Sequence, residues 1–431
     1  MNSNILKSQI QGKALDTWID KGCSGVVVMT MGSGKSRLGI NAIEHIKPVK
    51  CLITSPRTNL KESWLKEFRE WGYNPLKEVF TDNTYVIDIK GYKCSFTLEN
   101  IQTCYKWYRE VINEYDLIII DECHLCLSPE RSVFVVKALQ LKKKILGLTG
   151  TPNKSDEFKC NFYRTKLPIV FEYYDSAKDG LINHTMNYIF RYDLTDDFKV
   201  TVGTKKKSWT KGELSQYQYL SERYEKAKKT MAYLGADDFF KTSILWMKGI
   251  DENGNKLDKQ YVDVGRAFFN SIRYRKEFLW NLESSKYWCN RFKDRILQGT
   301  DNKVLIFSAL TNQASKLSRH SIHSKKESES NKLLLEQFNQ GVIRELSSCD
   351  MLTLGLNLKN AKYAIMESFN GSETSNSQKK GRLSRLESDE IASCIWIVPR
   401  NTQAETWLDN SLTSVDSKWI TEITNVNEIP I

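Results

Sequence analysis

The sequence lacks long apolar runs, an apolar start and any regular pairing of cysteines. Its 431 residues contain no stretch near the roughly 20 apolar residues that a bilayer-spanning helix needs. The opening residues 1–7 lack the apolar core of a secretory signal. Ten cysteines are scattered along the chain, and the C-x-x-C pair of Cys123 and Cys126 has no second pair to complete a zinc site. We therefore expect a cytoplasmic protein with no membrane partner and no disulfide framework.

Internal repeats and low-complexity tracts are also absent, so the composition is that of a globular protein. Apolar residues make up 40% and charged residues 27%, and the length predicts two or three domains at about 100–200 residues each. Lys and Arg number 63 against 52 Asp and Glu, which gives a net charge of +11. This surplus favours a polyanionic partner such as nucleic acid, although solvated lysines explain much of it equally well.

Apolar runs that read as buried strands alternate with helical patterns over residues 1–197. One such helical pattern is Leu60–Trp71, whose apolar residues fall at helical spacing. Continuous apolar strands alternating with helices predict a parallel sheet covered on both faces, and hence an N-terminal α/β domain. The expected strands are Gly25–Met29, Cys51–Thr54, Asp116–Ile120 and Lys144–Leu148.

The strand signal disappears over residues 198–301 and returns over residues 302–431. The middle stretch is rich in charged and aromatic residues at helical spacing, which predicts a helical insert. The final stretch predicts a second α/β domain. Its expected strands are Val304–Phe307, Ala364–Met366 and Cys394–Val398, with a helix over Glu327–Phe338. The predicted architecture is therefore two tandem parallel-sheet domains with a helical insert between them.

The first motif that carries chemistry follows the strand expected at Gly25–Met29 and precedes a helical pattern. In this setting glycines let backbone N–H groups point at phosphate oxygens, and the helix start adds its positive end. Lys35 would reach the β- and γ-phosphates, and the Ser36 hydroxyl would ligate Mg²⁺. Because Met29 occupies the position of the usual first glycine, a plain Gly-Ser turn remains an alternative. The motif reads Met29-Thr30-Met31-Gly32-Ser33-Gly34-Lys35-Ser36.

A second motif, Asp121-Glu122-Cys123-His124, stands at the end of the expected strand Asp116–Ile120. Ligands collect at the carboxyl ends of parallel strands, and two adjacent buried carboxylates without partners would be strongly destabilising. A magnesium ion would resolve this conflict. Asp121 would hold the metal through water, and Glu122 would orient and deprotonate the attacking water. An exposed acidic strand end is the structural alternative.

Together these motifs resemble those of the superfamily 2 helicases and translocases of the DExH-box type. The resemblance covers both α/β stretches but not the insert, and it implies two RecA-like domains that use ATP and Mg²⁺. It also implies that Gln11 reads the adenine base. Thr149-Gly150-Thr151-Pro152 matches the motif that couples nucleotide state to domain closure. His124 would link the acidic motif to the second domain.

The segment from Gln378 to Arg385 matches the family pattern Q-x-x-G-R-x-x-R. The resemblance implies that Arg385 acts as an arginine finger, with Arg382 beside it on the γ-phosphate and Gln378 helping to sense that group. The residues also support this reading independently, because arginines three apart share one helix face and suit a developing phosphoryl charge. A surface helix with solvated arginines is the structural alternative.

Three further segments resemble family elements that contact nucleic acid. Ser55-Pro56-Arg57-Thr58, followed by Trp64, is similar to the element that grips a nucleic-acid backbone. Gln102 and Thr103 resemble the next element more weakly. Thr353-Leu354-Gly355-Leu356-Asn357 is similar to the element in the second domain that contacts the strand. The resemblance thus implies nucleic-acid contacts at Pro56, Arg57, Gln102, Thr103, Thr353 and Gly355.

Aromatic and basic residues interleave in the insert, and two interpretations of them remain open. Bases could stack on the rings while phosphates pair with the cations. Alternatively, the rings could form a helical core with solvated cations around it, since aromatics at helical spacing are usually core. The residues are Trp209, Tyr217, Tyr219, Arg223, Tyr224, Arg266, Arg273, Tyr274 and Arg275.

The resemblance implies an ATP-dependent DNA helicase or translocase that unwinds or remodels branched DNA in replication, recombination or repair. The Thr149–Pro152 motif resembles the form seen in many double-stranded DNA translocases and remodelling helicases. The segment Arg273–Leu279 resembles a helical segment of phage branch-migration helicases and Swi/Snf-type motors, which makes forked or junction DNA the expected partner. We expect a monomer in the cytoplasm, or in the host cytoplasm for a phage protein. An RNA helicase and a non-hydrolysing, nucleotide-gated clamp or scaffold are the alternatives.

Overall fold

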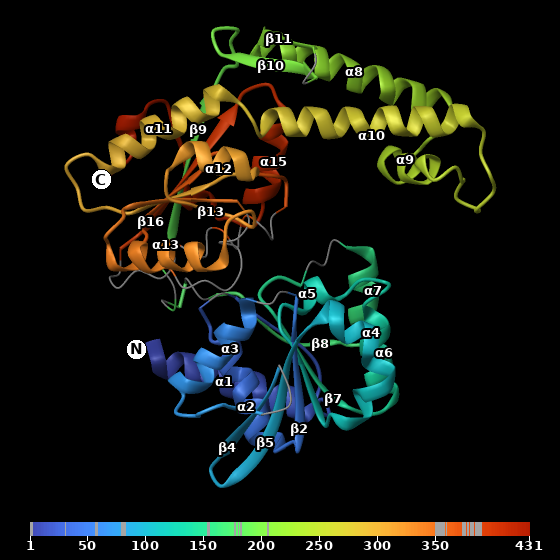
Figure 1. Ribbon diagram of the computed structural model, residues 1–431, viewed down its shortest axis with the longest axis vertical. Helices are drawn as coiled ribbons and strands as arrows, with labels where there is room; N and C mark the ends of the chain where they lie inside the picture. Colours follow the sequence, from blue (N-terminus) through green and yellow to red (C-terminus); the bar gives the residue numbers. More distant parts are fainter. Residues whose placement is uncertain are drawn as a thin grey trace. The chain divides into compact units, whose positions relative to one another are not determined.

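In the computed structural model, the apolar runs of the first stretch form one mostly parallel sheet (Figure 1). Its strand order is β3-β4-β5-β2-β6-β7-β1-β8, and only the pairs β3–β4 and β4–β5 are antiparallel. The expected strands are confirmed to within one residue at most ends. The bounds are β1 Ser24–Met29, β2 Lys50–Ser55, β3 Leu76–Lys77, β4 Thr84–Ile89, β5 Tyr92–Asn100, β6 Leu117–Ile120, β7 Lys144–Thr149 and β8 Ile169–Tyr173.

The structure describes most of the chain, with short gaps. The described residues are 3–30, 32–56, 59–78, 83–152, 156–175, 178–179, 181, 183–204, 207–349, 358, 360–372, 376, 379, 383 and 390–431. Their contacts divide the chain into two units, the first built mainly from Met1–His184 and the second mainly from Thr185 onward.

Helices cover both faces of the first sheet, as continuous apolar strands require (Figure 1). Successive strand residues point to opposite faces, so Val27 and Ile119 pack with the helices of one face while Val26 and Ile118 pack with those of the other. One face carries α1 Ser3–Asp20, α2 Lys35–Ile46 and α3 Asn59–Glu70, and the other carries α4 Ile101–Val111, α6 Ser132–Gln140 and α7 Glu157–Thr165.

The second unit contains a sheet whose strand pairs are all parallel, in the order β13-β14-β12-β15-β16-β9-β17. The strands are β9 Thr185–Tyr192, β12 Val304–Phe307, β13 Ser321–Ile322, β14 Glu345–Ser348, β15 Tyr363–Met366, β16 Ala392–Pro399 and β17 Ile420–Ile423. The helices packed on it are α11 Glu283–Leu297, α12 Thr311–Leu317, α13 Ser328–Gln340 and α15 Gln403–Leu412. The predicted fold class, two parallel-sheet α/β domains, is confirmed.

The boundaries between the predicted regions differ from those expected at 197 and 301. Strand β9 lies between β16 and β17 in the second sheet, so the first unit ends at His184 and not at 197. Helix α11 packs on β15 and β16, so the second domain begins well before residue 302. Sequence pattern alone could not reveal this, because a buried strand reads the same whichever sheet it joins.

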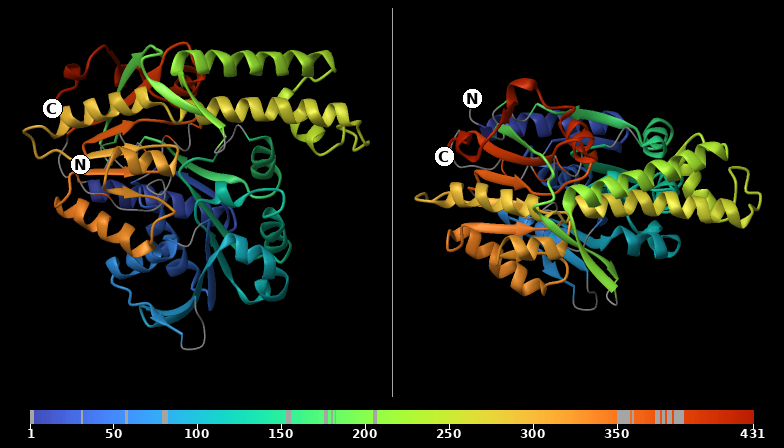
Figure 2. Two further views of the ribbon diagram at one scale, coloured as in Figure 1. Left: turned by 45° about the horizontal axis from the view of Figure 1, so that its top comes forward. Right: turned by 90° about the horizontal axis from the view of Figure 1, so that it is seen from above.

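The predicted helical insert is an arm that begins with a β-hairpin. Strands β10 Lys199–Thr204 and β11 Lys207–Gly212 pair antiparallel, where the sequence predicted no strands. Their Lys, Thr and Ser content hides the strand signal, because neither face is strongly apolar. Helices α8 Glu213–Tyr233 and α10 Lys259–Leu279 then run side by side, with α9 Phe239–Met247 packed at their far end (Figure 2).

Buried polar contacts attach this arm to the second sheet. The Glu213 side chain is fully buried and accepts hydrogen bonds from the backbone N–H groups of Glu283 and Ser284, at the start of α11. The Tyr217 hydroxyl accepts from the Gln403 backbone at 3.0 Å, and Arg275 donates to the Gln403 side chain at 3.1 Å. These hydrogen bonds make the arm an integral part of the second unit.

No helix within the described ranges is both long and apolar enough to cross a membrane.

Candidate active site

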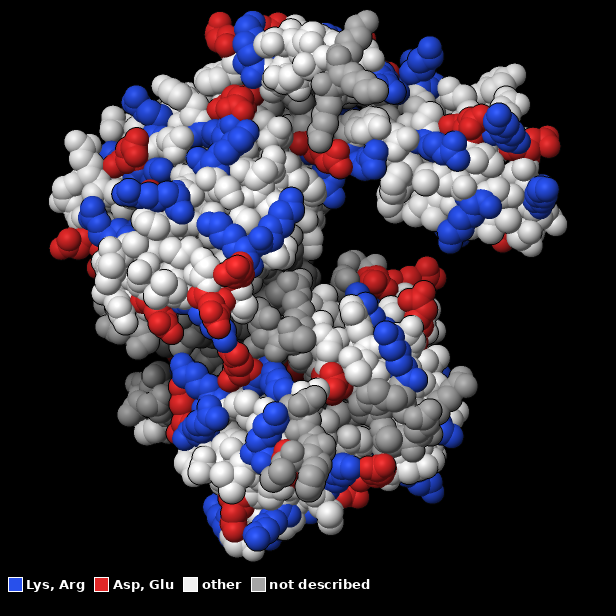
Figure 3. All heavy atoms as spheres, viewed as in Figure 1, with Lys and Arg blue, Asp and Glu red and all other residues white. Residues whose placement is uncertain are grey.

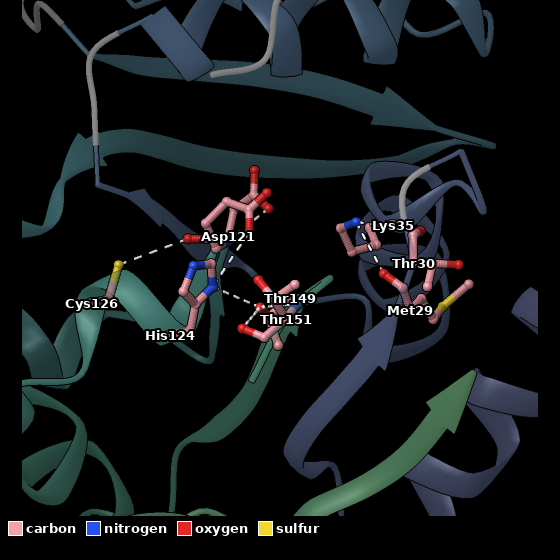
Figure 4. Close-up of polar contacts among 9 residues, drawn as sticks. Met29, Thr30, Lys35, Asp121, His124, Cys126, Thr149 and Thr151 are labelled. Carbon is pink, nitrogen blue, oxygen red and sulfur yellow. Dashed lines mark hydrogen bonds and ion pairs between the residues drawn. The ribbon is translucent and has the colours of Figure 1, made fainter. Parts of the chain in front are cut away.

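The loops that follow β1, β6 and β7 meet at one edge of the first sheet. These three strands are neighbours and run parallel, so their carboxyl ends lie together. Figure 4 shows Lys35 with the β1 loop and Asp121, His124, Thr149 and Thr151 gathered beside it. The residues singled out from three distant motifs in the sequence therefore form one cluster.

The phosphate-loop candidate turns tightly between β1 and α2. The Ser33 side chain is fully buried and its hydroxyl donates to the Thr30 carbonyl at 2.6 Å. The Lys35 ammonium donates to the Met29 carbonyl at 3.1 Å and to that of Thr30 at 3.5 Å. This geometry holds the ammonium over the loop, at the first turn of α2, where backbone N–H groups are free to bind an anion.

The two ends of this loop differ in whether they require glycine. Gly34 has φ +84°, and a Cβ there would lie 2.1 Å from the Gln11 amide nitrogen, so only glycine fits. Met29 replaces the usual first glycine without strain because it is still part of β1, and its side chain is fully buried in the core. The departure from the usual glycine pattern therefore leaves the turn intact.

Gln11 lies on α1 and is held against the same loop. Its side chain is 7% exposed, and its amide donates to the Ser33 carbonyl at 3.0 Å. The structure thus brings together the predicted glutamine and the loop. Ser36 follows Lys35 in the first turn of α2 and is half-buried.

Asp121 is buried directly after β6, where both of its carboxylate oxygens accept hydrogen bonds. Oδ1 accepts from the Glu122 backbone N–H at 3.0 Å, and Oδ2 accepts from the Trp64 indole at 3.0 Å. Burial, aided by the nearby charge of Glu122, raises the pKa of Asp121 to about 6, while Trp64 and Lys35 act against the shift. A cation bound at this edge would favour the ionised form.

Trp64 is a site residue whose role the sequence did not reveal. We expected it near a nucleic-acid backbone, but its side chain is 1% exposed and lies in the core against Asp121. Room for the indole comes from Gly39 on α2, where a Cβ would lie 2.5 Å from the Trp64 ring. A tryptophan on an amphipathic helix predicts burial, but nothing local predicts which carboxylate its N–H reaches.

His124 connects the acidic motif to the Thr149–Pro152 motif. Its Nδ1 lies 2.7 Å from the Thr149 hydroxyl, which in turn accepts from the Thr151 backbone N–H and donates to the Thr151 carbonyl. Because the hydroxyl hydrogen is already used, Nδ1 must donate. Burial lowers the pKa of His124 to about 3, and Lys159 and Lys35 add repulsion, so the ring is neutral at pH 7.

Glu122 has a backbone conformation that glutamate rarely adopts. Its φ is +46°, in the left-handed region, and one carboxylate oxygen lies 3.5 Å from His124 Nδ1. Strain of this kind persists where the surroundings hold it, and it clusters at functional sites. Within the described residues, three buried polar atoms at this edge have no hydrogen-bond partner: Glu122 Oε2, His124 Nε2 and Thr151 Oγ1.

The nearby cysteines belong to the core. Cys123 and Cys126 are fully buried, and Cys126 donates weakly to the Asp121 carbonyl at 3.8 Å. Burial raises the pKa of both thiols well above the ordinary value. Their C-x-x-C spacing therefore reflects packing behind the acidic motif.

Two of the candidate nucleic-acid elements lie together at the carboxyl ends of β2 and β5. The Asn100 side chain donates to the Pro56 carbonyl at 3.1 Å and accepts from the Gln102 backbone N–H at 2.8 Å. Gln102 and Thr103 are exposed in the first turn of α4, and β2 and β5 are neighbours. Other predicted site residues lie outside the described residues: Met31, Arg57, Thr353, Gly355, Gln378, Arg382 and Arg385.

The described residues fit a magnesium-bound nucleoside triphosphate. A turn with no space for a Cβ at Gly34, an ammonium, a buried carboxylate and unpartnered polar atoms converge at one sheet edge. Backbone N–H groups and Lys35 could bind phosphate oxygens, while Ser36 and Asp121 could hold the metal. Glu122 could act on a water molecule in front of them.

Comparison with protein families agrees with this arrangement. Residues 5–154 match the family described as the res subunit of type III restriction enzymes, and residues 289–387 match the helicase conserved C-terminal domain. Together these two matches support a superfamily 2 helicase. The predicted enzyme class, an ATP-hydrolysing helicase, is thereby confirmed.

Several curated relatives resemble the helicase. The DNA 3'-5' translocase XPB2 of Sulfurisphaera tokodaii is 22% identical over 398 residues, which span 91% of this chain and 81% of the relative. The probable helicase D10 of Escherichia phage T5 is 26% identical over 132 residues, which span 30% of this chain but only 27% of the phage protein.

Solved structures share the fold of the helicase. The Hef helicase domain of Pyrococcus furiosus has a TM-score of 0.55 at 14% identity, covering 94% of this chain and 97% of that one. Dbp5 of S. cerevisiae, bound to RNA and ADP BeF3, also has a TM-score of 0.55 at 10% identity, covering 96% of this chain and 89% of that one. These similarities establish the fold of the helicase.

Proposed function

We propose that the helicase hydrolyses ATP to translocate on DNA and to unwind or remodel branched DNA, such as forks and junctions, in replication, recombination or repair. The observation that carries the proposal is the cluster of Lys35, Asp121, Glu122 and His124 at one sheet edge, linked to Thr149 by a 2.7 Å contact. This contact joins the proposed hydrolytic site to the Thr149–Pro152 motif, which is suited to transmitting the nucleotide state of the site.

In this proposal the first domain supplies the binding and base groups. Lys35 and the backbone N–H groups of the β1 loop hold the β- and γ-phosphates, and Gln11 reads the adenine. Asp121 and Ser36 hold Mg²⁺, which when bound neutralises phosphate charge. Glu122 takes a proton from the attacking water. The motif match assigns the second domain Arg385 as finger, with Arg382 and Gln378 beside the γ-phosphate.

His124 is suited to sense that chemistry because it is neutral and donates to Thr149. A change in charge at Glu122, 3.5 Å from the same nitrogen, would weaken or strengthen this hydrogen bond. Thr149, Gly150 and Thr151 would then pass the change to the following loop. Movement follows if each domain grips nucleic acid differently in the two states.

The nucleic acid is proposed to contact Pro56, Gln102 and Thr103 in the first domain. The hydrogen bonds of Asn100 keep these loops adjacent, so they can form one contact surface. Resemblance adds Arg57 in the first domain and Thr353 and Gly355 in the second. Phosphate contacts of this kind position the chain without reading sequence.

DNA is preferred over RNA because the relative matched over most of the chain is named a DNA translocase. The resemblance of the segment Arg273–Leu279 to branch-migration helicases supports branched DNA, and the T5 match agrees with a phage-type enzyme. An RNA helicase is the second candidate, favoured by the fold shared with RNA-bound Dbp5. A non-hydrolysing clamp is disfavoured by both family matches. We propose that the chain acts as a monomer.

We expect ATP turnover to rise most with forked DNA or four-way junctions, less with single strands or duplex, and least with RNA. Binding to each substrate should weaken steeply with salt, because phosphate contacts release counterions. The Lys35→Ala variant should bind DNA as the wild type does but lack turnover with all substrates. Greatest stimulation by RNA would replace the DNA assignment, and no stimulation by any polynucleotide would overturn the motor.

We also expect Trp64→Phe to lower ATP turnover about 10- to 100-fold and to raise the Mg²⁺ concentration needed, as loss of a group supporting a metal ligand does. Phenylalanine keeps an aromatic ring, although a smaller one, but loses the hydrogen bond to Asp121. Binding of a fluorescent ATP analogue, with and without Mg²⁺, separates this effect from loss of chemistry.

The matched control is Trp18→Phe. Trp18 is fully buried in the same core cluster, and its indole donates to the backbone carbonyl of Ile145 at 2.9 Å instead of to a carboxylate. Both variants should lose similar thermal stability, but only Trp64→Phe should change the Mg²⁺ dependence. An equal change in both would reduce Trp64 to a packing residue.

A further inference from the structure

The arm separates its aromatic residues into a buried set and an exposed set. Tyr217 is buried at the arm's base, and Tyr224 is partly buried against the distal cluster of Met231, Trp246 and Phe268. Trp209 on β11 and Tyr219 on α8 are instead 49% and 44% exposed. The core interpretation therefore holds for the first set, whereas the side chains of the second set are exposed to solvent.

Two cations accompany these exposed rings. The Lys211 ammonium lies 4.7 Å from the centre of the Tyr219 ring, and the Arg223 guanidinium lies 5.7 Å from it. Trp209 and Lys211 are two residues apart in a strand, so they share one face of the hairpin. Tyr219 and Arg223 are four apart on α8 and are neighbours on the helix surface. Hairpin and helix thus contribute one ring and one cation each.

Three cations of the arm form ion pairs, and the two beside the exposed rings are not among them. Lys241 pairs with Glu252, Arg266 with Asp263 and Arg273 with Glu277. Figure 3 accordingly shows basic and acidic side chains interspersed over the far half of the arm. In the part of the chain that the structure describes, neither Lys211 nor Arg223 forms an ion pair. Their charges are therefore available to an external anion.

We propose that Trp209, Lys211, Tyr219 and Arg223, called the hairpin patch, bind single-stranded nucleic acid. Bases would stack on the two rings, and the adjacent phosphates would pair with the two cations. A duplex cannot use the rings this way, because its bases are already stacked inside. Residues 199–280 carry 17 Lys and Arg against 10 Asp and Glu, so the arm as a whole attracts a polyanion. This inference rests on the proposed nucleic-acid function.

The test measures binding of labelled oligo(dT), oligo(U) and a blunt duplex by fluorescence anisotropy, without nucleotide. Each of Trp209→Ala and Tyr219→Ala should weaken single-strand binding by about 10-fold, as loss of one stacked base does. Trp209→Phe should restore most of the affinity. Affinity falls as salt rises, and removing both cations should make this dependence less steep. The magnitude of the slope of log affinity against log salt should fall by about 1.4, at about 0.7 per phosphate contact on single strands.

Matched controls come from the same arm. Tyr233→Ala removes a tyrosine that is 90% exposed at the other end of α8, and Arg266→Ala removes a cation that is already paired. Both should bind single strands as the wild type does. ATP hydrolysis without polynucleotide and the thermal melting point should be unchanged in every patch variant.

The outcomes separate the patch from the proposed function. Wild-type protein that binds none of the three probes and no forked DNA would overturn the nucleic-acid function itself. Wild-type binding with unchanged affinity in the Trp209 and Tyr219 variants would overturn the patch alone. The patch would also be overturned if its variants lost affinity only for the duplex, or if Tyr233→Ala lost as much single-strand affinity as they do. Parallel losses with oligo(dT) and oligo(U) would support stacking as the shared mode of contact.

Discussion

Replacing Glu122 by glutamine is expected to lower ATP turnover by about 10²- to 10⁴-fold, the range that a general base contributes. Glutamine keeps the size of the side chain and can still form hydrogen bonds, but it cannot accept the proton of the attacking water. The Glu122 carboxylate has a buried oxygen without a hydrogen-bond partner among the described residues. The neighbouring His124 would not replace it, because its pKa is lowered to about 3 and its ring is therefore a weak base.

Steady-state phosphate release measures this loss, and anisotropy should show nucleic-acid affinity close to that of the wild type. Glu130→Gln is the control, because Glu130 is exposed in the loop that follows α5 Cys123–Cys126. It should leave turnover unchanged. If Glu122→Gln turned over ATP within a few-fold of the wild type, Glu122 would not be the base. Asp121 would then be the next candidate for that role.

Arg385→Ala should lower turnover by about 10³-fold or more, since an arginine that stabilises transferring phosphoryl charge contributes that much. The prediction depends on the Q-x-x-G-R-x-x-R match. Arg385→Lys should not restore activity, because an ammonium lacks the planar fork of the guanidinium. Binding of a fluorescent ATP analogue should change far less than turnover, which would separate stabilisation of the transition state from binding of the ground state.

Arg400→Ala supplies the comparison for the second domain. Arg400 is about half exposed and lies 3.4 Å from Asp193, so its removal deletes a surface cation of the same type. Its turnover should match the wild type, as surface ion pairs contribute little. Wild-type turnover in Arg385→Ala would exclude the finger, and Arg382 would be the next arginine to test.

The catalytic half-site in the first domain could be predicted from sequence because its chemistry is local. A strand, a glycine turn and a lysine at a helix start are contiguous, and so are the four residues from Asp121 to His124. Each motif therefore carries its own geometry. The parallel sheet then brings the ends of β1, β6 and β7 together, so correct strands were enough to predict that the motifs meet.

Contacts between distant segments could not be predicted in this way. The hydrogen bond of Trp64 to Asp121 joins α3 to β6, and the partner of a buried indole depends on packing, which leaves no trace in the local pattern. Strand β9 likewise reads as buried but joins the second sheet. The hairpin of β10 and β11 was missed because its polar residues give no alternation that distinguishes it from a loop.

The sequence by itself determined the two α/β domains, the phosphate loop, the acidic motif and the family, because period, residue type and short spacing are properties of neighbouring residues. Only the tertiary structure decided which aromatics of the arm are core and which are exposed. Tyr217 and Tyr219 lie two residues apart on one helix, and a helix places such residues on different faces. Which face is covered depends on where α10 and the second sheet lie, and distant parts of the chain supply both.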